Sequence, residues 1–248
     1  MKKVYFLSDA HLGSWAIGRW RENERRLVAF LESIRHEASA IYILGDLFDF
    51  WHEYRYVVPK GYTRLLGKLG ELCDQGVEVH VFTGNHDLWC GDYLEKECGV
   101  TLHREALTVK LQGVNLFMAH GDGLDRTDKK YLALRWMFHN RVCQRLFASI
   151  HPRWAMWFGY TWAKHSRKKH EQEEGHFEGM EKEGLAVFAR HYLKDHPETD
   201  AFLFGHYHVE VDEMLSPKTR FIILGEWISK YTYVVLDEGK LTMKNYTE

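Results

Sequence analysis

Cysteine is scarce in this sequence, with four residues in 248, and no two of them form a CxxC pair. Cys73, Cys90, Cys98 and Cys143 also show no regular spacing. We therefore expect reduced thiols in a cytosolic protein rather than a disulfide framework. The chain is long enough, and at 45% hydrophobic residues apolar enough, to bury a sizeable core without covalent cross-links.

Long apolar runs and an excess of one charge are absent too. No stretch approaches the roughly 20 apolar residues of a membrane-spanning helix, and the apolar run in the opening MKKVYFLSDAH is too short for the core of a signal peptide. A formal net charge of -2 gives no overall sign of nucleic-acid binding. We expect a cytoplasmic protein without a nucleic-acid partner, for which any contact with a membrane is peripheral.

What is present is an alternation of strand-like and helix-like segments, without internal repeats or low-complexity regions. β-Branched and aromatic segments predict strands at Val4–Ser8, Ala40–Gly45, Val77–Gly84, Leu107–Leu111, Val114–His120, Ala201–Gly205, Phe221–Gly225, Tyr231–Asp237 and Lys240–Tyr246. Helices are expected at Trp20–His36, Tyr62–Gln75, Asp92–Glu97 and Gly184–Lys194. A strand–helix half followed by hairpins predicts an α/β fold with two packed sheets and helices outside them.

Five of the predicted strands end in side chains that can bind metal. These are Asp9 and His11; Asp46 and Asp49; Asn85, His86 and Asp87; His120 and Asp122; and His206 and His208. Ligands collect at the carboxyl ends of strands in open α/β sheets, so we expect these side chains to converge. Carboxylates and imidazoles without thiolates suit Mn, Fe or Zn. A cluster this rich indicates two ions that act together in phosphoryl transfer.

Each motif has an ordinary explanation when it is taken alone. Asp46 in GDxxD could be a helix N-cap, His120 could be a hydrogen-bonded core histidine, and the GHYH that contains His206 could be a turn. The GNHD motif after a strand is the most specific of the set. The motifs DxH, GDxxD, GNHD, HGD and GHxH are not expected to occur in this order by chance. The sequence therefore predicts a metal site.

The segment 124–183 departs from the alternation of strands and helices. It looks helical throughout and holds Trp136, Trp154, Trp157 and Trp162. Residues 126–170 carry eleven Lys or Arg residues and a single acid, Asp128. A plain helical hairpin with a solvated basic face and an inserted binding subdomain explain this composition about equally well.

The ordered motifs resemble those of the calcineurin-like binuclear metallophosphoesterases, over residues 1–122 and about 201–235. The resemblance implies a metallophosphoesterase-type sandwich of two mixed sheets flanked by helices. It places a first metal on Asp9, His11, Asp46 and His208, and a second on Asp46, Asn85, His120 and His206, with Asp46 as the bridge. His86 and Asp87 are the implied catalytic residues: His86 acts beside the scissile phosphate, and Asp87, like Asp122, orients imidazoles. Asp49 is a weaker candidate for the same role, with capping as its ordinary alternative.

Within that superfamily, the chain length, the GDLFDFW run and the helical segment after HGD resemble the branch that cleaves UDP-2,3-diacylglucosamine in lipid A biosynthesis. The resemblance implies a core of residues 1–123 and 184–248 and a helical lid of residues 124–183. It also implies two divalent ions, with Mn expected and Fe or Zn as alternatives, peripheral contact with the inner face of the cytoplasmic membrane, and no protein partner. In the lid, the contacts implied for the lipid-tailed substrate are Asp128, Thr161, His165 and Lys168. His86 stands where the best-studied members have Arg.

Three other functions fit parts of the sequence. A metallophosphoesterase for another nucleotide or a phosphoprotein would share the same core, and a nuclease could grip single strands with the basic and aromatic segment. A non-enzymatic scaffold of this fold is disfavoured because every ligand position is filled. The aromatic segment favours a lipid-tailed substrate, since burying each CH₂ group contributes about 0.8 kcal/mol.

Overall fold

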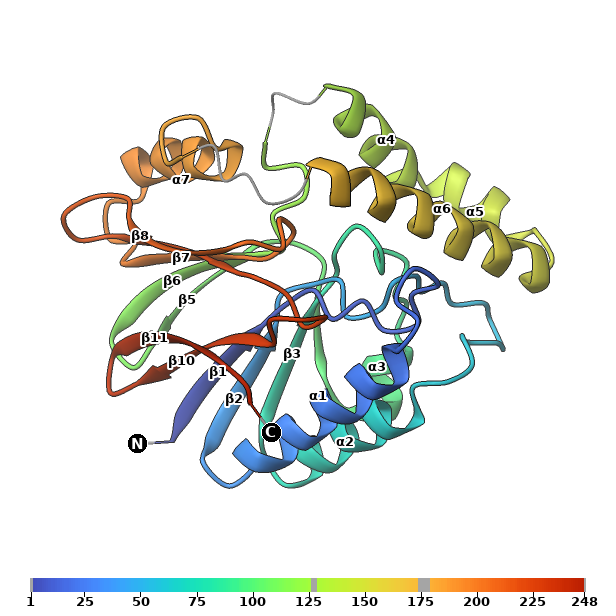
Figure 1. The fold of residues 1–248 in the computed structure, drawn as a ribbon, viewed down its shortest axis with the longest axis horizontal. Coiled ribbons are helices and arrows are strands. Elements are labelled where there is room, and N and C mark those ends of the chain that lie inside the picture. The colour runs from blue at the N-terminus through green and yellow to red at the C-terminus, as the bar shows by residue number, and fades with distance from the viewer. Residues whose placement is uncertain (1, 126–128, 174–178, 248) are drawn as a thin grey trace.

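Two β-sheets pack face to face in the computed structural model, which describes residues 2–125, 129–173 and 179–247 (Figure 1). The sheets have the strand orders β11-β10-β1-β2-β3-β4 and β5-β6-β7-β9-β8. The strands are β1 Lys3–Leu7, β2 Ala38–Ile43, β3 Glu78–Phe82, β4 Thr101–His103, β5 Leu107–Leu111, β6 Val114–Ala119, β7 Ala201–Phe204, β8 Glu210–Met214, β9 Arg220–Leu224, β10 Thr232–Asp237 and β11 Lys240–Asn245. Both sheets mix parallel and antiparallel pairs, which confirms the predicted fold class.

The apolar strand residues form three hydrophobic clusters, one between the two sheets and one on the outer face of each sheet. Phe6, Leu203 and Ile222 are among the residues buried between the sheets. Helices α1 (Trp20–Ile34), α2 (Thr63–Asp74) and α3 (Tyr93–Cys98) cover the outer face of the first sheet, and α7 (Gly184–Asp195) covers the second (Figure 1). β1, β2 and β3 run parallel to one another, as do β6, β7 and β9. The carboxyl ends of each set therefore meet at one edge of its sheet.

All the strands and helices predicted outside residues 124–183 are present, with ends within two residues of the expected ones. Two strands were missed. β4 is too short to show a strand pattern. β8 lies at the edge of its sheet with only Val211 buried, so its exposed, acidic sequence does not look like a strand.

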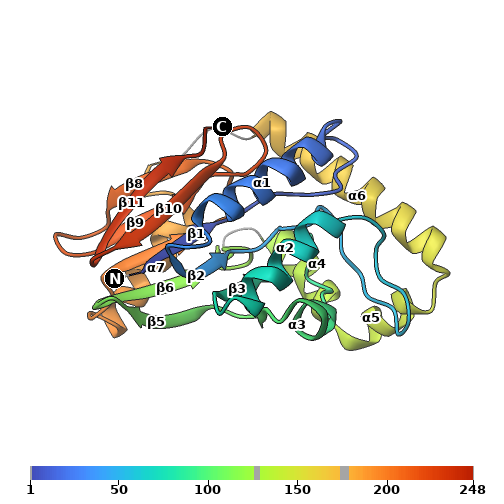
Figure 2. The ribbon, with the colours of Figure 1, turned by 90° about the horizontal axis from the view of Figure 1, so that it is seen from below.

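Residues 129–173 form three helices over the edge at which the parallel strands end: α4 (Lys129–His139), α5 (Arg141–Ala148) and α6 (Pro152–Glu173) (Figure 1). Seen from below, α5 and α6 extend beyond the sandwich (Figure 2). This confirms the helical character of the described part of the segment, while its limits as a separate unit stay a prediction. None of the helices described here is both long and apolar enough to span a membrane.

Candidate metal centre and active site

Strained backbone marks the ends of the strands that meet at this edge. Asp9, His11, Asp46, His206 and His208 have φ values of 56°, 43°, 50°, 74° and 54°. An L-residue in this left-handed region costs roughly 1–2 kcal/mol, and such residues persist where function requires them. The strain turns five of the seven predicted metal ligands away from the strand direction and into a common cluster.

One half of the cluster combines the loops after β1 and β7. Nε2 of His11 lies 3.1 Å from Nε2 of His208, 3.7 Å from Oδ1 of Asp9 and 3.5 Å from Oδ2 of Asp46. Nε2 of His208 lies 3.2 Å from Oδ1 of Asp9. Among the described residues, this buried Oδ1 accepts no hydrogen bond. Nitrogen and oxygen atoms that can bind a metal thus converge in a buried space, as they do around a cation.

The other half is built around His120, which follows β6. Its Nδ1 lies 2.8 Å from the carbonyl oxygen of Leu44, which can only accept, so Nδ1 carries the proton. Nε2 then presents its lone pair to Oδ1 of Asn85 at 3.1 Å and to Oδ2 of Asp46 at 3.4 Å. Acceptors that face acceptors require a proton or a metal ion between them.

Asp46 joins the two halves, because its Oδ2 is 3.5 Å from Nε2 of His11 and 3.4 Å from Nε2 of His120. Burial raises the pKa of Asp46, but the imidazoles of His120, His86 and His11 outweigh it and hold the pKa well below its usual range. Asp46 is therefore an anion placed between two groups of ligands.

The donor set fits divalent metal ions. Three sets of side chains offer ligand atoms that all lie within 4.8 Å of one another: Asp9, His11 and His208; His11, Asp46 and His86; and Asp9, Asp46 and His120. Carboxylate and imidazole ligands without thiolates suit Mn, Fe and Zn. His206 adjoins these sets, with its ring 5.1 Å from that of His120 and its backbone N–H donating to Oδ2 of Asp9.

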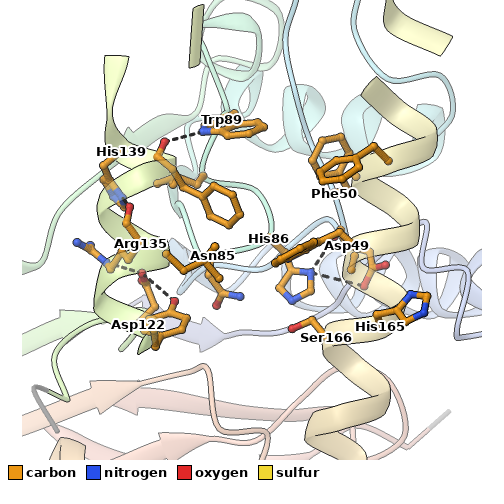
Figure 3. Close-up of a pocket in the computed structure, with 18 of the residues that line it drawn as sticks. Asp49, Phe50, Asn85, His86, Trp89, Asp122, Arg135, His139, His165 and Ser166 are labelled. Carbon is orange, nitrogen blue, oxygen red and sulfur yellow. Dashed lines mark hydrogen bonds and ion pairs between the residues drawn. The ribbon is translucent and has the colours of Figure 1, made fainter. Parts of the chain in front are cut away.

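His86 lies between the metal cluster and a cavity. Its Nδ1 is 2.8 Å from the carbonyl oxygen of Asp49, and its backbone N–H donates to Oδ1 of Asp46 at 2.9 Å. The ring meets that of His11 edge to face at 4.7 Å. Because Nδ1 donates to a carbonyl, Nε2 is the nitrogen left for a substrate or a metal (Figure 3).

Two buried carboxylates support the cluster in different ways. Asp49 lies with Oδ1 3.3 Å from Nδ1 of His11, which favours contact with this imidazole over capping. Asp87 instead accepts hydrogen bonds from the backbone N–H groups of Gly84 and Phe48, at 2.7 and 3.2 Å, and so ties two ligand-bearing loops together. Burial and the charge of Asp46 raise its pKa to about 7.

Asp122 connects the cluster to the helices above it. Its Oδ2 accepts a hydrogen bond from Nε of Arg135 at 2.8 Å and lies 3.5 Å from the hydroxyl of Tyr131, both on α4 (Figure 3). Asp122 thus bonds to α4, and its expected role in orienting an imidazole stays a prediction.

A cavity of about 470 Å³ lies between the cluster and α4, α5 and α6 (Figure 3). Its polar lining residues include Asp49, Asn85, His86, Asp122, Lys130, Tyr131, Arg135, His139, His165 and Ser166, and its apolar lining residues include Phe50, Leu88, Trp89, Leu134, Phe138, Phe147, Phe158, Trp162 and Ala163. Trp136, Trp154 and Trp157, also expected here, do not line it and are 69%, 60% and 54% exposed. The aromatic residues thus divide between the cavity and the outer surface.

Of the four lid residues expected to contact substrate, His165 lines the cavity, and its Nδ1 is held 2.9 Å from the carbonyl oxygen of Thr161. Thr161 itself is not among the lining residues. Asp128 lies outside the described residues, and the side chain of Lys168, in α6, is not described. Ser166 lines the cavity and was missed, since a lone serine in a helix gives no signal in the sequence.

Known proteins resemble this chain over almost its whole length. A family model for calcineurin-like phosphoesterase matches residues 2–210, which include all seven predicted metal ligands. UDP-2,3-diacylglucosamine hydrolase of Porphyromonas gingivalis is 44% identical over 254 residues, covering 98% of this chain and 97% of that protein. The protein of the same name from Neisseria gonorrhoeae is 30% identical, and the match covers 96% of this chain and 95% of that protein. The one from Haemophilus influenzae is 28% identical, and the match covers 96% of this chain and 97% of that protein.

Proposed function

Because the chain belongs to the calcineurin-like phosphoesterase family, we propose that this metal-dependent phosphoesterase hydrolyses the pyrophosphate bond of UDP-2,3-diacylglucosamine, yielding UMP and 2,3-diacylglucosamine 1-phosphate for lipid A biosynthesis. The observation that carries the proposal is the cavity beside the metal cluster, whose lining combines charged and polar side chains with aromatic and aliphatic ones. A lipid-tailed phosphate ester combines the same two characters. The similarity to three hydrolases named for this substrate supports it.

The cluster provides for two divalent ions, and we propose Mn²⁺ for both, with Fe or Zn as alternatives. Asp9, His11, Asp46 and His208 would hold the first, and Asp46, Asn85, His120 and His206 the second. Bound ions would activate a water molecule and stabilise charge on the attacking and leaving oxygens. The position of Asp46 between His11 and His120 supports its role as the bridge.

His86 is the proposed proton donor to the leaving oxygen. With Nδ1 bonded to the carbonyl of Asp49, a second proton can reside only on Nε2, which belongs to the wall of the cavity. A charged imidazole there also stabilises negative charge on the phosphoryl group. Asp87 supports this step by fixing the loops that carry His86 and Asp46, rather than by contact with substrate.

The lid is proposed to bind the lipid half of the substrate. Phe138, Phe147 and Trp162 would cover acyl carbons. Lys130 and His165 line the same cavity and would contact the sugar phosphate. Asp128, Thr161 and Lys168 remain proposed substrate contacts on the strength of the family resemblance alone.

We further propose that the outer surface of the lid rests on the inner face of the cytoplasmic membrane. Val142, Leu146 and Trp154 are exposed there, and Arg141 and Arg145 are exposed beside them. Monomeric proteins rarely expose apolar patches of this extent without a binding role. Arginine beside the apolar residues favours anionic headgroups.

The decisive experiment incubates the Mn²⁺-loaded protein with UDP-2,3-diacylglucosamine and measures released UMP, alongside UDP-sugars without acyl chains. We expect kcat/KM to be much higher for the acylated substrate. Equal values would remove the lipid from the proposal and indicate a phosphodiesterase that acts on nucleotides.

A further inference from the structure

The proposed substrate has two arms, one on each side of the scissile bond, and the cavity accounts for only one of them. The cavity borders the cluster at Asn85, His86 and Asp122. Asp9, His11 and His208, which form the other half of the cluster, are not among its lining residues. If the lipid arm occupies the cavity, the nucleotide arm extends from the metal ions in the other direction, on the side of His11 and His208.

An exposed aromatic ring lies in the loop that carries His11. Trp15 is four residues beyond His11 and 49% exposed. One face of its indole stacks on the ring of Tyr160, with centroids 5.1 Å apart and planes at 16°. Tyr160 belongs to α6 but does not line the cavity, so Trp15 is on another flank of α6. Because Trp15 is about half exposed, part of its ring surface remains for a planar ligand.

This aromatic platform is held in place by the surrounding residues. Gly13, at φ +88°, passes so close to the hydroxyl of Tyr62 that a side chain would not fit there. The hydroxyls of Tyr62 and Tyr160 are 3.0 Å apart and hydrogen bonded. Buried Ser14 accepts a hydrogen bond from the backbone N–H of Ala16 at 3.3 Å. A platform that is already ordered costs less entropy when a ligand binds.

A positive charge is found at the same end of the cluster. Nζ of Lys230 donates to the carbonyl oxygen of His208 at 3.2 Å and is otherwise exposed. The loop that carries it is tied to α1, where Nδ2 of Asn23 donates to the carbonyl of Ile228 at 3.2 Å. The loop that carries Trp15 leads directly into the same helix. The aromatic ring and the cation are thus each tied to a loop that carries a ligand of the half of the cluster outside the cavity, Trp15 to the loop of His11 and Lys230 to that of His208.

We propose that Trp15 stacks on the uracil of the nucleotide arm and that Lys230 pairs with its phosphate, forming a pyrimidine-nucleotide subsite separated from the acyl cavity by α6. This inference rests on the proposed substrate and extends it to the half of the molecule that the cavity does not hold.

Titration calorimetry of the Mn²⁺-loaded protein with UMP, and with ribose 5-phosphate as a probe that lacks the base, tests the subsite. Trp15→Ala should weaken UMP binding roughly 5- to 100-fold, the range for removing an aromatic side chain that stacks on a base. It should leave ribose 5-phosphate binding and the metal content unchanged, and Trp15→Phe should restore most of the UMP affinity. Trp136→Ala, at an exposed tryptophan outside the subsite, should bind UMP like the unaltered protein.

Lys230→Met should weaken UMP and ribose 5-phosphate alike, and less so at high salt, because an exposed charge is screened. Unchanged UMP affinity in Trp15→Ala, or an equal loss for both probes, would overturn the subsite. The proposed function is decided separately, by release of UMP from UDP-2,3-diacylglucosamine, so failure of one can be told from failure of the other.

Discussion

Gly159 in α6 lies so close to the ring of Phe50 that a β-carbon at position 159 would overlap it. Phe50 follows β2 and cannot retreat freely, because its ring is packed among those of Trp89, Phe147 and Tyr160. The contact therefore sets how closely the lid approaches the metal-bearing loops.

Gly159→Ala should lift α6 and widen the cavity. Overpacking of a tight contact typically costs 1–3 kcal/mol, so we expect kcat/KM for the acylated substrate to fall about 5- to 100-fold while both metals are retained. Gly67→Ala is the matched control, since Gly67 lies in α2 with open space beside it, and alanine should slightly stabilise that helix. A Gly159→Ala enzyme with unaltered kcat/KM for the acylated substrate would show that this contact does not position the lid.

Asp46→Ala should abolish binding of both metals and nearly all activity, because the carboxylate lies between both sets of ligands. Metal analysis after loading with Mn²⁺ should give close to two ions per chain for the unaltered protein. Asp212→Ala, which removes a surface carboxylate paired with Arg220, should retain both. Full activity in Asp46→Ala would disprove the bridged centre.

His86→Ala separates a proton donor from a metal ligand. For a proton donor, kcat should fall by roughly 10²–10⁴ with the metal content unchanged. Loss of an ion would instead assign His86 to the set it forms with His11 and Asp46. His36→Ala, at an exposed histidine at the end of α1, is the control for nonspecific effects on metal loading.

Leu146→Glu and Trp154→Glu should reduce sedimentation with anionic phospholipid vesicles, because each places a negative charge on the apolar outer face of the lid. Binding by the unaltered protein should weaken as salt is raised, since its basic residues are screened within about a Debye length. Met214→Glu, which changes an exposed apolar residue on β8, is the control and should sediment like the unaltered protein. If Leu146→Glu and Trp154→Glu also sediment like the unaltered protein, the membrane contact lies elsewhere.

His52 should make the protein sensitive to acid. It is buried among the rings of Tyr54, Trp89 and Phe147, and burial lowers its pKa to about 4, whereas the unfolded chain takes up the proton near pH 6.5. The unfolded state binds more protons between these values, so stability is lost as the pH falls from about 6.5 to about 4. The free energy of unfolding, measured with denaturant at pH 7 and at pH 5, should fall less for His52→Phe than for the unaltered protein. An equal fall in both proteins would contradict this prediction.

The order of motifs along the chain was enough to predict the sandwich and the convergence of Asp9, Asp46, His120 and His208, because parallel strands bring their carboxyl ends to one edge. The sequence left two roles open for Asp49, since a carboxylate after a strand looks the same whether it caps a helix or contacts His11. The division of the tryptophans between cavity and surface was also hidden. It depends on how α4, α5 and α6 pack, and the sequence of one helix does not contain that information.

His11 and His208 are 197 positions apart in the chain, yet their Nε2 atoms lie 3.1 Å apart. During synthesis, a ribosome makes β1, β2, β3 and the helices α4, α5 and α6 before it adds His208. The half of the centre that contains Asp9 and His11 therefore stays incomplete until about five-sixths of the protein has been made. A chain that ends before His208 would lack one of the proposed ligands of the first metal.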